Sequence, residues 1–308
     1  MVDSGLGLVL KSTGSWYEVL SEGECLQCRI RGKLRLKGVR STNPVVVGDW
    51  VRFETDEQGG YVISAIEPRR NYIIRRASNL SKESHIIAAN VDQALLVVTL
   101  FSPATATEFV DRFLVTCEAY KVPVTILLAK IDLARKHPEA VEEFHAIYES
   151  AGYKIVEVSA TEGDGVEEVR ELLRGKTTLL SGNSGVGKST LVAAVEQGLD
   201  IKTGEISQSH HKGKHTTTFS TMYPLAEGGY IIDTPGIKGF GLIDIEDAEL
   251  AHYFPEMMRF LPDCRFYNCS HTHEPGCAVV EAVKQGEIAY PRYESYLKIM
   301  DEDDKYRK

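Results

Sequence analysis

Residues 177–190 read TTLLSGNSGVGKST, and this stretch decides the fold of the chain. Within it, residues 182–189 match the pattern G-x-x-x-x-G-K-[ST], between an apolar run at 177–180 and a helical run from Thr190. A glycine-rich turn in that setting lets backbone N–H groups wrap phosphates, and the start of the helix adds favourable partial charge. The sequence therefore predicts a P-loop nucleotide site made of Gly182, Asn183, Ser184, Gly185, Val186, Gly187, Lys188, Ser189 and Thr190.

A second motif follows the P-loop. We expect Lys188 to reach the β- and γ-phosphates and Ser189 to hold Mg²⁺. Residues 233–236 read Asp-Thr-Pro-Gly at the end of another apolar run, in the form D-x-x-G. Asp233 would lie near the Mg²⁺, and the N–H of Gly236 could sense the γ-phosphate. The spacing of this motif after the P-loop favours that role over an ordinary Asp-Thr-Pro-Gly turn.

Two short motifs before the P-loop indicate which base is bound. Lys130-Ile131-Asp132 follows the apolar run 124–129, and Ser159-Ala160 ends the run 154–158. The Asp132 carboxylate could accept two hydrogen bonds from guanine, at N1 and the 2-amino group, a donor pair that adenine lacks. Such a contact is selective because the wrong base leaves the carboxylate unpaired. The backbone at Ser159 and Ala160 could contact guanine O6.

The apolar pattern predicts three domains. Residues 1–72 contain short runs separated by Gly, Ser and Asn, as in a small OB-fold barrel. Residues 73–243 alternate strands and helices, which predicts an α/β domain with a mainly parallel sheet, helices on both faces and one antiparallel hairpin near 217–225 and 229–232. Residues 244–308 are helical and rich in Cys and His. We expect the strands at 6–10, 16–20, 24–31, 33–37, 49–55, 61–67, 93–100, 124–129, 154–158, 177–181 and 230–233, and the helices at 107–120, 138–151, 245–258, 278–285 and 292–306.

The order of the motifs carries a family resemblance. Along this chain K-x-D comes first, then S-A, the P-loop, a Thr cluster at 216–218 and D-x-x-G. Ordinary small GTPases begin with the P-loop, so this chain resembles the circularly permuted GTPases. With its N-terminal barrel and C-terminal Cys/His segment, it resembles the small ribosomal subunit biogenesis GTPase (RsgA) family over almost its full length, including the segment GKHTTT at 213–218.

The resemblance implies a function and one departure. Members of the family hydrolyse GTP to GDP and phosphate with Mg²⁺, bind the small ribosomal subunit and its 16S rRNA in late maturation of the 30S subunit, and leave after hydrolysis. The family usually carries an Asn, which contacts the base and braces the P-loop, where this chain has Ala129. The replacement bears on tight guanine binding and not on the fold, and Asp132 is expected to retain most of the selectivity.

The catalytic group is expected outside D-x-x-G. Many GTPases place a Gln after that motif to orient the attacking water, but Ile237 stands here and cannot hydrogen-bond to water. His215 is our candidate for this role, and the family also carries a His in this position; the alternative is a solvated loop residue. Thr217 is our candidate for the Mg²⁺ and γ-phosphate contact in a first switch. We expect docking on rRNA to order this segment, so that hydrolysis is slow until the subunit stimulates it.

Cysteine spacing predicts one metal site. Cys264-x4-Cys269-x-His271-x5-Cys277 offers three thiolates and an imidazole, the closed tetrahedral set that structural Zn²⁺ prefers. The alternative is a cluster of free thiols. His273 is expected at the surface, and the alternative is that it competes as a metal ligand. The isolated pair Cys25 and Cys28 is expected on a strand and a turn of the barrel rather than at a metal site, and Cys117 is expected in a helix facing the core.

Charge is distributed unevenly. The formal net charge is −9, yet Arg29, Arg31, Lys33, Arg35 and Lys37 alternate along one stretch of the barrel region without an intervening anion. In an unbroken strand they would share one face, whereas a turn at Gly32 would split them between two strands. A solvated strand face usually carries mixed charges, so we expect these cations to contact RNA.

Other classes of protein fit less well. The start of the chain lacks a signal peptide pattern and no apolar run approaches the roughly 20 residues that span a bilayer, so we expect a cytoplasmic protein, and a monomer. A P-loop ATPase or kinase of small-molecule metabolism is the main alternative, and Lys130 with Asp132 argues against it. A nucleic-acid-binding module with vestigial hydrolysis is the second alternative.

Overall fold

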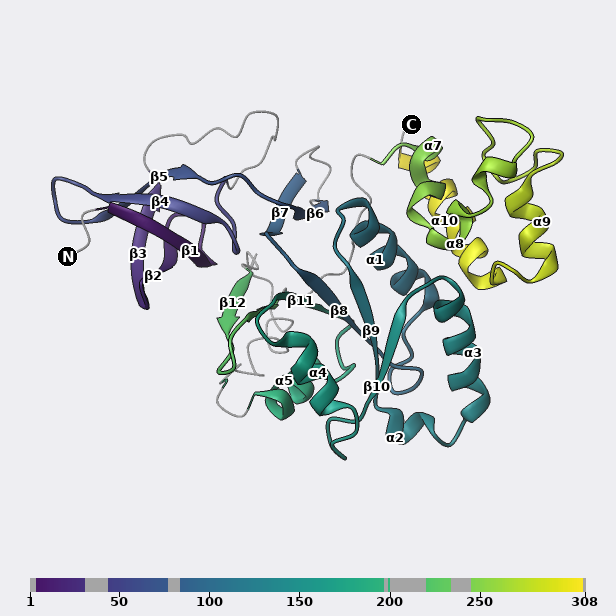
Figure 1. Cartoon of the computed structure of the whole chain (residues 1–308), viewed down its shortest axis with the longest axis horizontal. Coiled ribbons are helices and arrows are strands. Elements are labelled where there is room, and N and C mark those ends of the chain that lie inside the picture. The colour runs from purple at the N-terminus through teal and green to yellow at the C-terminus, as the bar shows by residue number, and fades with distance from the viewer. Residues whose placement is uncertain are drawn as a thin grey trace.

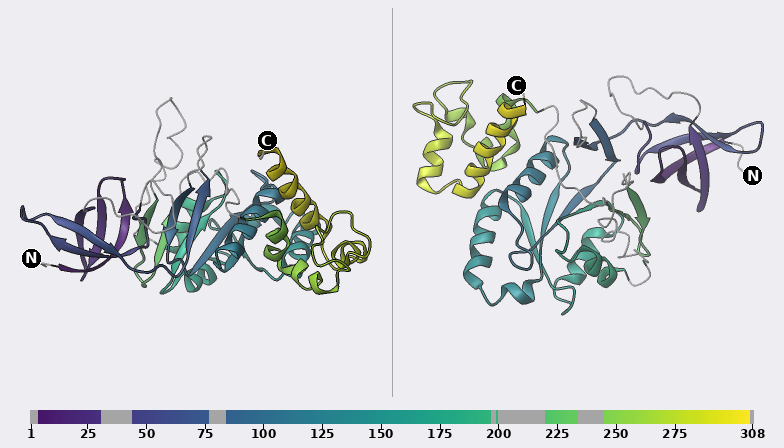
Figure 2. Two further views of the ribbon diagram at one scale, coloured as in Figure 1. Left: turned by 90° about the horizontal axis from the view of Figure 1, so that it is seen from above. Right: turned by 180° about the vertical axis from the view of Figure 1, so that it is seen from behind.

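The computed structural model describes residues 4–30, 44–76, 84–196, 199, 220–233 and 245–306. Three parts lie in a row (Figures 1 and 2): a β-barrel near the N-terminus, an α/β domain in the middle and a helical module at the C-terminal end. Among the described residues, no helix is both long and apolar enough to cross a membrane.

Five strands close the N-terminal barrel: β1 (Ser4–Ser12), β2 (Tyr17–Ser21), β3 (Glu24–Ile30), β4 (Trp50–Thr55) and β5 (Tyr61–Ile66). They pair in the order β1-β2-β3-β5-β4, and β4 pairs back with β1. Side chains alternate across the barrel wall, so that Val51 and Phe53 are buried while Trp50 and Arg52 are exposed. The predicted barrel is confirmed; the strand expected at 33–37 lies outside the described residues.

The middle domain has a six-stranded sheet in the order β10-β9-β8-β11-β13-β12. Only β12 runs antiparallel, and it forms the predicted hairpin with β13. All six residues of β8 are buried, as expected for a central parallel strand covered on both faces. The bounds are β8 Gln93–Val98, β9 Val124–Ala129, β10 Lys154–Val158, β11 Thr177–Ser181, β12 Thr221–Pro224 and β13 Tyr230–Asp233.

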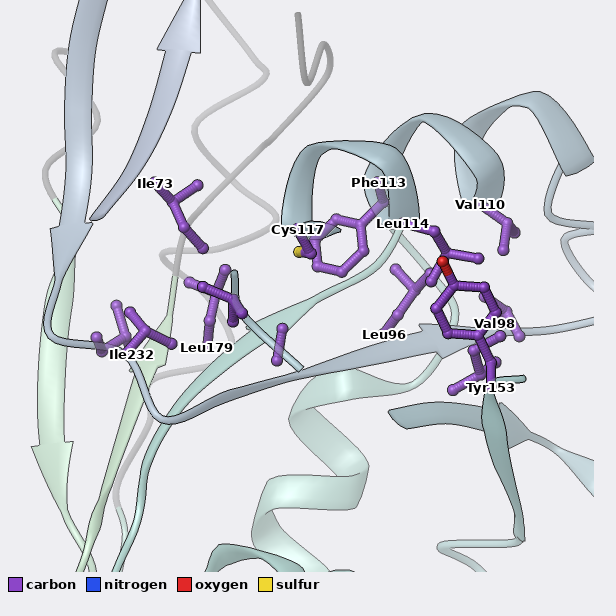
Figure 3. Packing of buried hydrophobic residues seen from close by; sticks show 14 of the residues in the cluster. Ile73, Leu96, Val98, Val110, Phe113, Leu114, Cys117, Tyr153, Leu179 and Ile232 are labelled. Carbon is purple, nitrogen blue, oxygen red and sulfur yellow. The ribbon is translucent and has the colours of Figure 1, made fainter. Parts of the chain in front are cut away.

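Helices cover both faces of this sheet because alternate strand residues point to opposite sides. Leu96 and Val98 of β8 pack with α1 (Thr107–Ala119) and α3 (Pro138–Ser150), as Figure 3 shows for Phe113 and Leu114 of α1. Leu95 and Val97 of the same strand pack with α4 (Val166–Leu173) and α5 (Lys188–Val195) on the other face. A short helix, α2 (Ile131–Ala134), follows β9.

The barrel and the sheet are joined. Lys11 of β1 pairs with Thr221 of β12, so the two parts form one 11-stranded sheet. Leu8 and Leu10 of β1 belong to the core of the middle domain. An extra hairpin of β6 (Tyr72–Arg76) and β7 (Ser84–Ala89) lies between them and was not predicted. The domain boundaries at residues 72 and 243 stay predictions.

The C-terminal module consists of short helical pieces and one long helix. The single helix expected at 245–258 was wrong, because Phe254 is extended before Pro255 and splits the segment. The helix expected at 292–306 begins at Tyr290 instead. The observed elements are α7 (Asp247–Leu250), η1 (Ala251–Tyr253), α8 (Pro255–Met258), η2 (Leu261–Asp263), α9 (Ala278–Gln285) and α10 (Tyr290–Tyr306).

Candidate functional site

The predicted P-loop connects β11 to α5. Gly182, Gly185 and Gly187 have φ angles of 147°, 84° and 102°, a region that favours glycine. At Gly182 an added Cβ would lie 2.4 Å from the carbonyl oxygen of Val97 in β8, so no side chain fits there. The loop therefore bends closely over the neighbouring strand before α5 begins at Lys188, two residues before the expected start.

Lys188 lies at the start of α5 beside Asp233. Its Nζ donates to the backbone oxygens of Gly182, at 2.5 Å, and Asn183, at 2.9 Å. Burial lowers the pKa of Lys188, while the charge of Asp233 opposes that shift. Leu180 and Asp233 are partners in the parallel β11–β13 pair, which brings the D-x-x-G aspartate to the P-loop. The remaining residues expected in this part of the site, Thr217, His215 and Gly236, lie outside the described residues.

The two base motifs meet at the ends of neighbouring strands. Val158 and Ala129 are partners in the parallel β10–β9 pair, so Ser159 and Lys130 follow side by side. The hydroxyl of Ser159 donates to Oδ1 of Asp132 at 2.8 Å. This hydrogen bond fixes the carboxylate and leaves it able to accept from a base.

Lys130 links the base motif to the P-loop. Its backbone is left-handed, with φ 56°, and its Nζ donates to the carbonyl oxygen of Gly185 at 2.7 Å. The same Nζ donates to the carbonyl oxygen of Ser102, at 2.5 Å, a contact that the motifs alone do not indicate. Phosphate and base motifs thus lie along one edge, where the carboxyl ends of β9, β10, β11 and β13 meet. Ligands of open α/β sheets bind at this edge.

Cys264, Cys269, His271 and Cys277 converge in the C-terminal module, with all their ligand atoms within 4.8 Å of one another. Nδ1 of His271 lies 3.6 Å from Sγ of Cys264 and 3.5 Å from Sγ of Cys277. Zinc bonds of ordinary length in a tetrahedron would place S and N about 3.5 Å apart. The donor set and its spacing therefore fit Zn²⁺, and the ligand set predicted from sequence is brought together.

The surroundings hold this cluster in place. Helix α10 supports the ligand loop, since the hydroxyls of Tyr293 and Tyr296 donate to the backbone oxygens of His271 and Ser270, both at 2.8 Å. Burial raises the pKa of the Cys269 and Cys277 thiols, so a bound cation would be needed to favour their thiolates.

The other His and Cys residues singled out from the sequence are His273, Cys117, Cys25 and Cys28. His273 is exposed and outside the metal-ligand cluster, as predicted. Cys117 is buried in α1. Cys25 and Cys28 both lie on β3, the first exposed and the second buried, so the turn expected for one of them was wrong.

Of the predicted RNA-contacting cations, Arg29 is described. It lies exposed on β3, with its guanidinium carbon 4.1 Å from the centre of the Trp16 ring. The other four, Arg31, Lys33, Arg35 and Lys37, lie outside the described residues.

Two family models match parts of this chain. The sequence model described as RsgA GTPase matches residues 66–243, and the one described as RsgA N-terminal domain matches residues 6–63. The chain belongs to the RsgA GTPase family. It is a circularly permuted GTP hydrolase, and the resemblance inferred from motif order is confirmed.

Relatives match the chain over nearly its whole length. Proteins of Bacteroides fragilis and Porphyromonas gingivalis, both named small ribosomal subunit biogenesis GTPase RsgA, are each 53% identical, with 98% of each chain covered. The crystal structure of YjeQ from Thermotoga maritima is 37% identical with a TM-score of 0.77, covering 97% of this chain and 98% of that one. YloQ, described as a circularly permuted GTPase, is 30% identical with a TM-score of 0.72, covering 99% and 96%.

Proposed function

We propose that this GTPase acts in late maturation of the 30S ribosomal subunit and that the small subunit stimulates its hydrolysis of GTP to GDP and phosphate. The names of the relatives support the partner. The observation that carries the nucleotide assignment is the pairing of Asp132 with Ser159 on the edge that also holds the P-loop. That pairing holds a carboxylate where a guanine could donate to it.

The proposed GTP-binding site divides into a phosphate end and a base end. Lys188 leaves its two carbonyl partners to contact the β- and γ-phosphates, while the loop N–H groups wrap them. Asp132 accepts from guanine, and Lys130 spans the two ends through Gly185. The residues assigned to the GTP-binding site are Lys130, Asp132, Ser159, Ala160, Gly182, Asn183, Ser184, Gly185, Val186, Gly187, Lys188, Ser189, Thr190, Asp233 and Gly236.

Ser189 and Thr217 would hold Mg²⁺, with Asp233 close by. When bound, the ion neutralises charge on the β- and γ-phosphates. Burial lowers the pKa of Lys188, and the triphosphate favours the charged form of this side chain. His215 orients the attacking water in this proposal, because Ile237 has no polar side-chain atom to do so.

Cys264, Cys269, His271 and Cys277 would hold one Zn²⁺ in a structural role. The S–N distances of 3.5 and 3.6 Å and the all-protein donor set support a closed site. When bound, the ion ties together the loop between η2 and α9, which lies against α10 through Tyr293.

The barrel would contact 16S rRNA through Arg29, Arg31, Lys33, Arg35 and Lys37. The exposed stack of Arg29 on Trp16 supports this, because both planar groups suit contact with nucleotides. We also propose that the protein acts in the cytoplasm as a monomer. Charge reversal at Arg31, Lys33 and Arg35 and added salt would both weaken binding to the subunit.

Nucleotide competition tests the base assignment against an ATPase or kinase. Displacement of a fluorescent GDP analogue from the full chain would be measured with GTP, GDP and ATP. We expect GTP and GDP to displace it at far lower concentrations than ATP, because adenine cannot donate twice to Asp132. Equal displacement by ATP would reject guanine selectivity.

A further inference from the structure

The loop 99–105 between β8 and α1 lies against the P-loop. A Cβ added at Gly185 would be 3.4 Å from Cδ of Pro103, which is van der Waals contact. Beside Pro103, Ser102 has a left-handed φ of 54° and turns its carbonyl oxygen to Lys130. None of the nucleotide motifs includes this loop.

Thr99 closes the loop from inside. Its hydroxyl donates to the carbonyl oxygen of Pro103 at 2.5 Å, and its N–H donates to Oγ1 of Thr105 at 3.0 Å. In return, the N–H of Thr105 donates to the carbonyl oxygen of Thr99 at 2.8 Å. Thr99 is 1% exposed, so water does not compete for these bonds. The two threonines therefore fix the direction of the Ser102 carbonyl that lies between them.

Lys130 transmits this direction to the P-loop. One ammonium donates both to Ser102, at 2.5 Å, and to Gly185, at 2.7 Å. The stem of the same side chain passes over Gly187, where an added Cβ would lie 3.8 Å from Cε of Lys130. Both glycines have positive φ and carry no side chain, so contacts from outside the P-loop hold its backbone in shape.

We propose that Thr99 is a positioning residue for nucleotide binding. Through the Ser102 carbonyl it orients Lys130, and Lys130 holds Gly185 so that the P-loop N–H groups face the phosphates before the nucleotide arrives. Ordering a loop in advance improves affinity because the ordering cost is not incurred on binding. This inference rests on the GTP-binding site proposed above and adds to it a residue that does not touch the nucleotide.

Thr99→Val and Thr99→Ser form the matched pair that tests it. Valine keeps the shape of the side chain and removes the hydroxyl, whereas serine keeps the hydroxyl. In the full chain, we expect Thr99→Val to lower the affinity for both GDP and GTP by about three- to tenfold, the range expected for the loss of one hydrogen bond. Thr99→Ser should bind like the unmutated protein. The preference for GTP over ATP should not change, because both nucleotides carry the same phosphates and the base contact at Asp132 is intact. The KM for GTP should rise while kcat is retained.

A double-mutant cycle with Lys130→Met asks whether Thr99 acts through Lys130. We expect Thr99→Val to have little further effect on GDP affinity in the Lys130→Met background. Equal losses in both backgrounds would overturn the proposal. Thr105→Val, which removes the acceptor for the Thr99 N–H, provides a second variant and should also lower the affinity for GDP.

Unchanged GDP affinity in folded Thr99→Val or Thr105→Val would also overturn the proposal. That result would not contradict the proposed GTP-binding site. If instead the unmutated chain failed to bind GDP, the proposed GTP-binding site would be rejected, and the positioning role of Thr99 with it.

Discussion

Arg292 of α10 and Asp111 of α1 form an ion pair whose two side chains have no exposed surface, with Nη1 2.7 Å from Oδ1. Glu256 of α8 accepts from the same guanidinium, at 2.7 Å from Nε and 3.2 Å from Nη2. The ring centre of Phe254 lies 4.8 Å away. Burial raises the pKa of Asp111, and the charge of Arg292 opposes that shift. A buried charged cluster therefore fastens the C-terminal module to the GTPase domain.

Removing Arg292 should destabilise this junction. Arg292→Met would leave two buried carboxylates without their cation, and breaking a buried pair in this way costs about 3–5 kcal/mol. We expect a clearly lower midpoint of unfolding, measured by chemical denaturation. Lys298→Met is the control, because this α10 lysine pairs with Glu108 of α1 and Glu294 of α10 at the exposed surface, where ion pairs should contribute little. Equal unfolding midpoints for the two variants would contradict the importance of the cluster.

Loss of a zinc ligand should affect one part of the chain. We expect about one zinc per chain to co-purify with the unmutated protein and to be lost in Cys269→Ser. The C-terminal module should then unfold on its own while GDP binding persists, because the P-loop packs in a different core. Cys25→Ser, at an exposed cysteine outside the cluster, should keep the metal. Elemental analysis that finds no zinc in the unmutated protein would reject the site.

Base selectivity should follow Asp132. Asp132→Asn replaces one acceptor oxygen with an amide donor, so guanine nucleotides should bind more weakly. Xanthosine diphosphate, which has an oxygen where guanine has its 2-amino group, should bind better to this variant than to the unmutated protein. Asp164→Asn is the control, since that carboxylate pairs with Arg135 at the surface. Competition binding checks both variants, and retained GDP preference in Asp132→Asn would assign the base contact elsewhere.

The parts of the fold that the sequence predicted are those with a local pattern. The glycines of the P-loop and the ligand spacing from Cys264 to Cys277 report chemistry directly. Continuous apolar runs such as β8 report a strand buried on both faces. Each of these signals depends on neighbours along the chain, so it can be interpreted without knowing the fold.

Contacts between distant segments have no such pattern. The pairing of Lys11 with Thr221 joins strands far apart in sequence. Arg292 resembles a surface residue of an amphipathic helix, and its burial depends on carboxylates from two other helices. The link from Thr99 to Lys130 passes through the backbone oxygen of Ser102, which every residue type possesses. Such contacts emerge only when the chain is folded.

His215 should matter for stimulated hydrolysis and not for binding. With saturating GTP and small subunits, we expect His215→Ala to lose the stimulated turnover while its affinity for GTP is retained, because the imidazole is assigned to the water. His211→Ala, four positions earlier in the sequence, is the matched control and should keep the stimulation. Full stimulated turnover in His215→Ala would reject this residue as the catalytic group and leave the GTPase assignment intact.

Subunit-dependent hydrolysis tests the central claim most directly. Phosphate release from GTP would be measured for the full chain alone, with purified small ribosomal subunits and with purified large subunits at the same concentration. We predict slow release alone and with large subunits, and strong acceleration with small subunits, because in our proposal docking on the RNA brings His215 to the attacking water. Equal rates in all three mixtures would contradict the account.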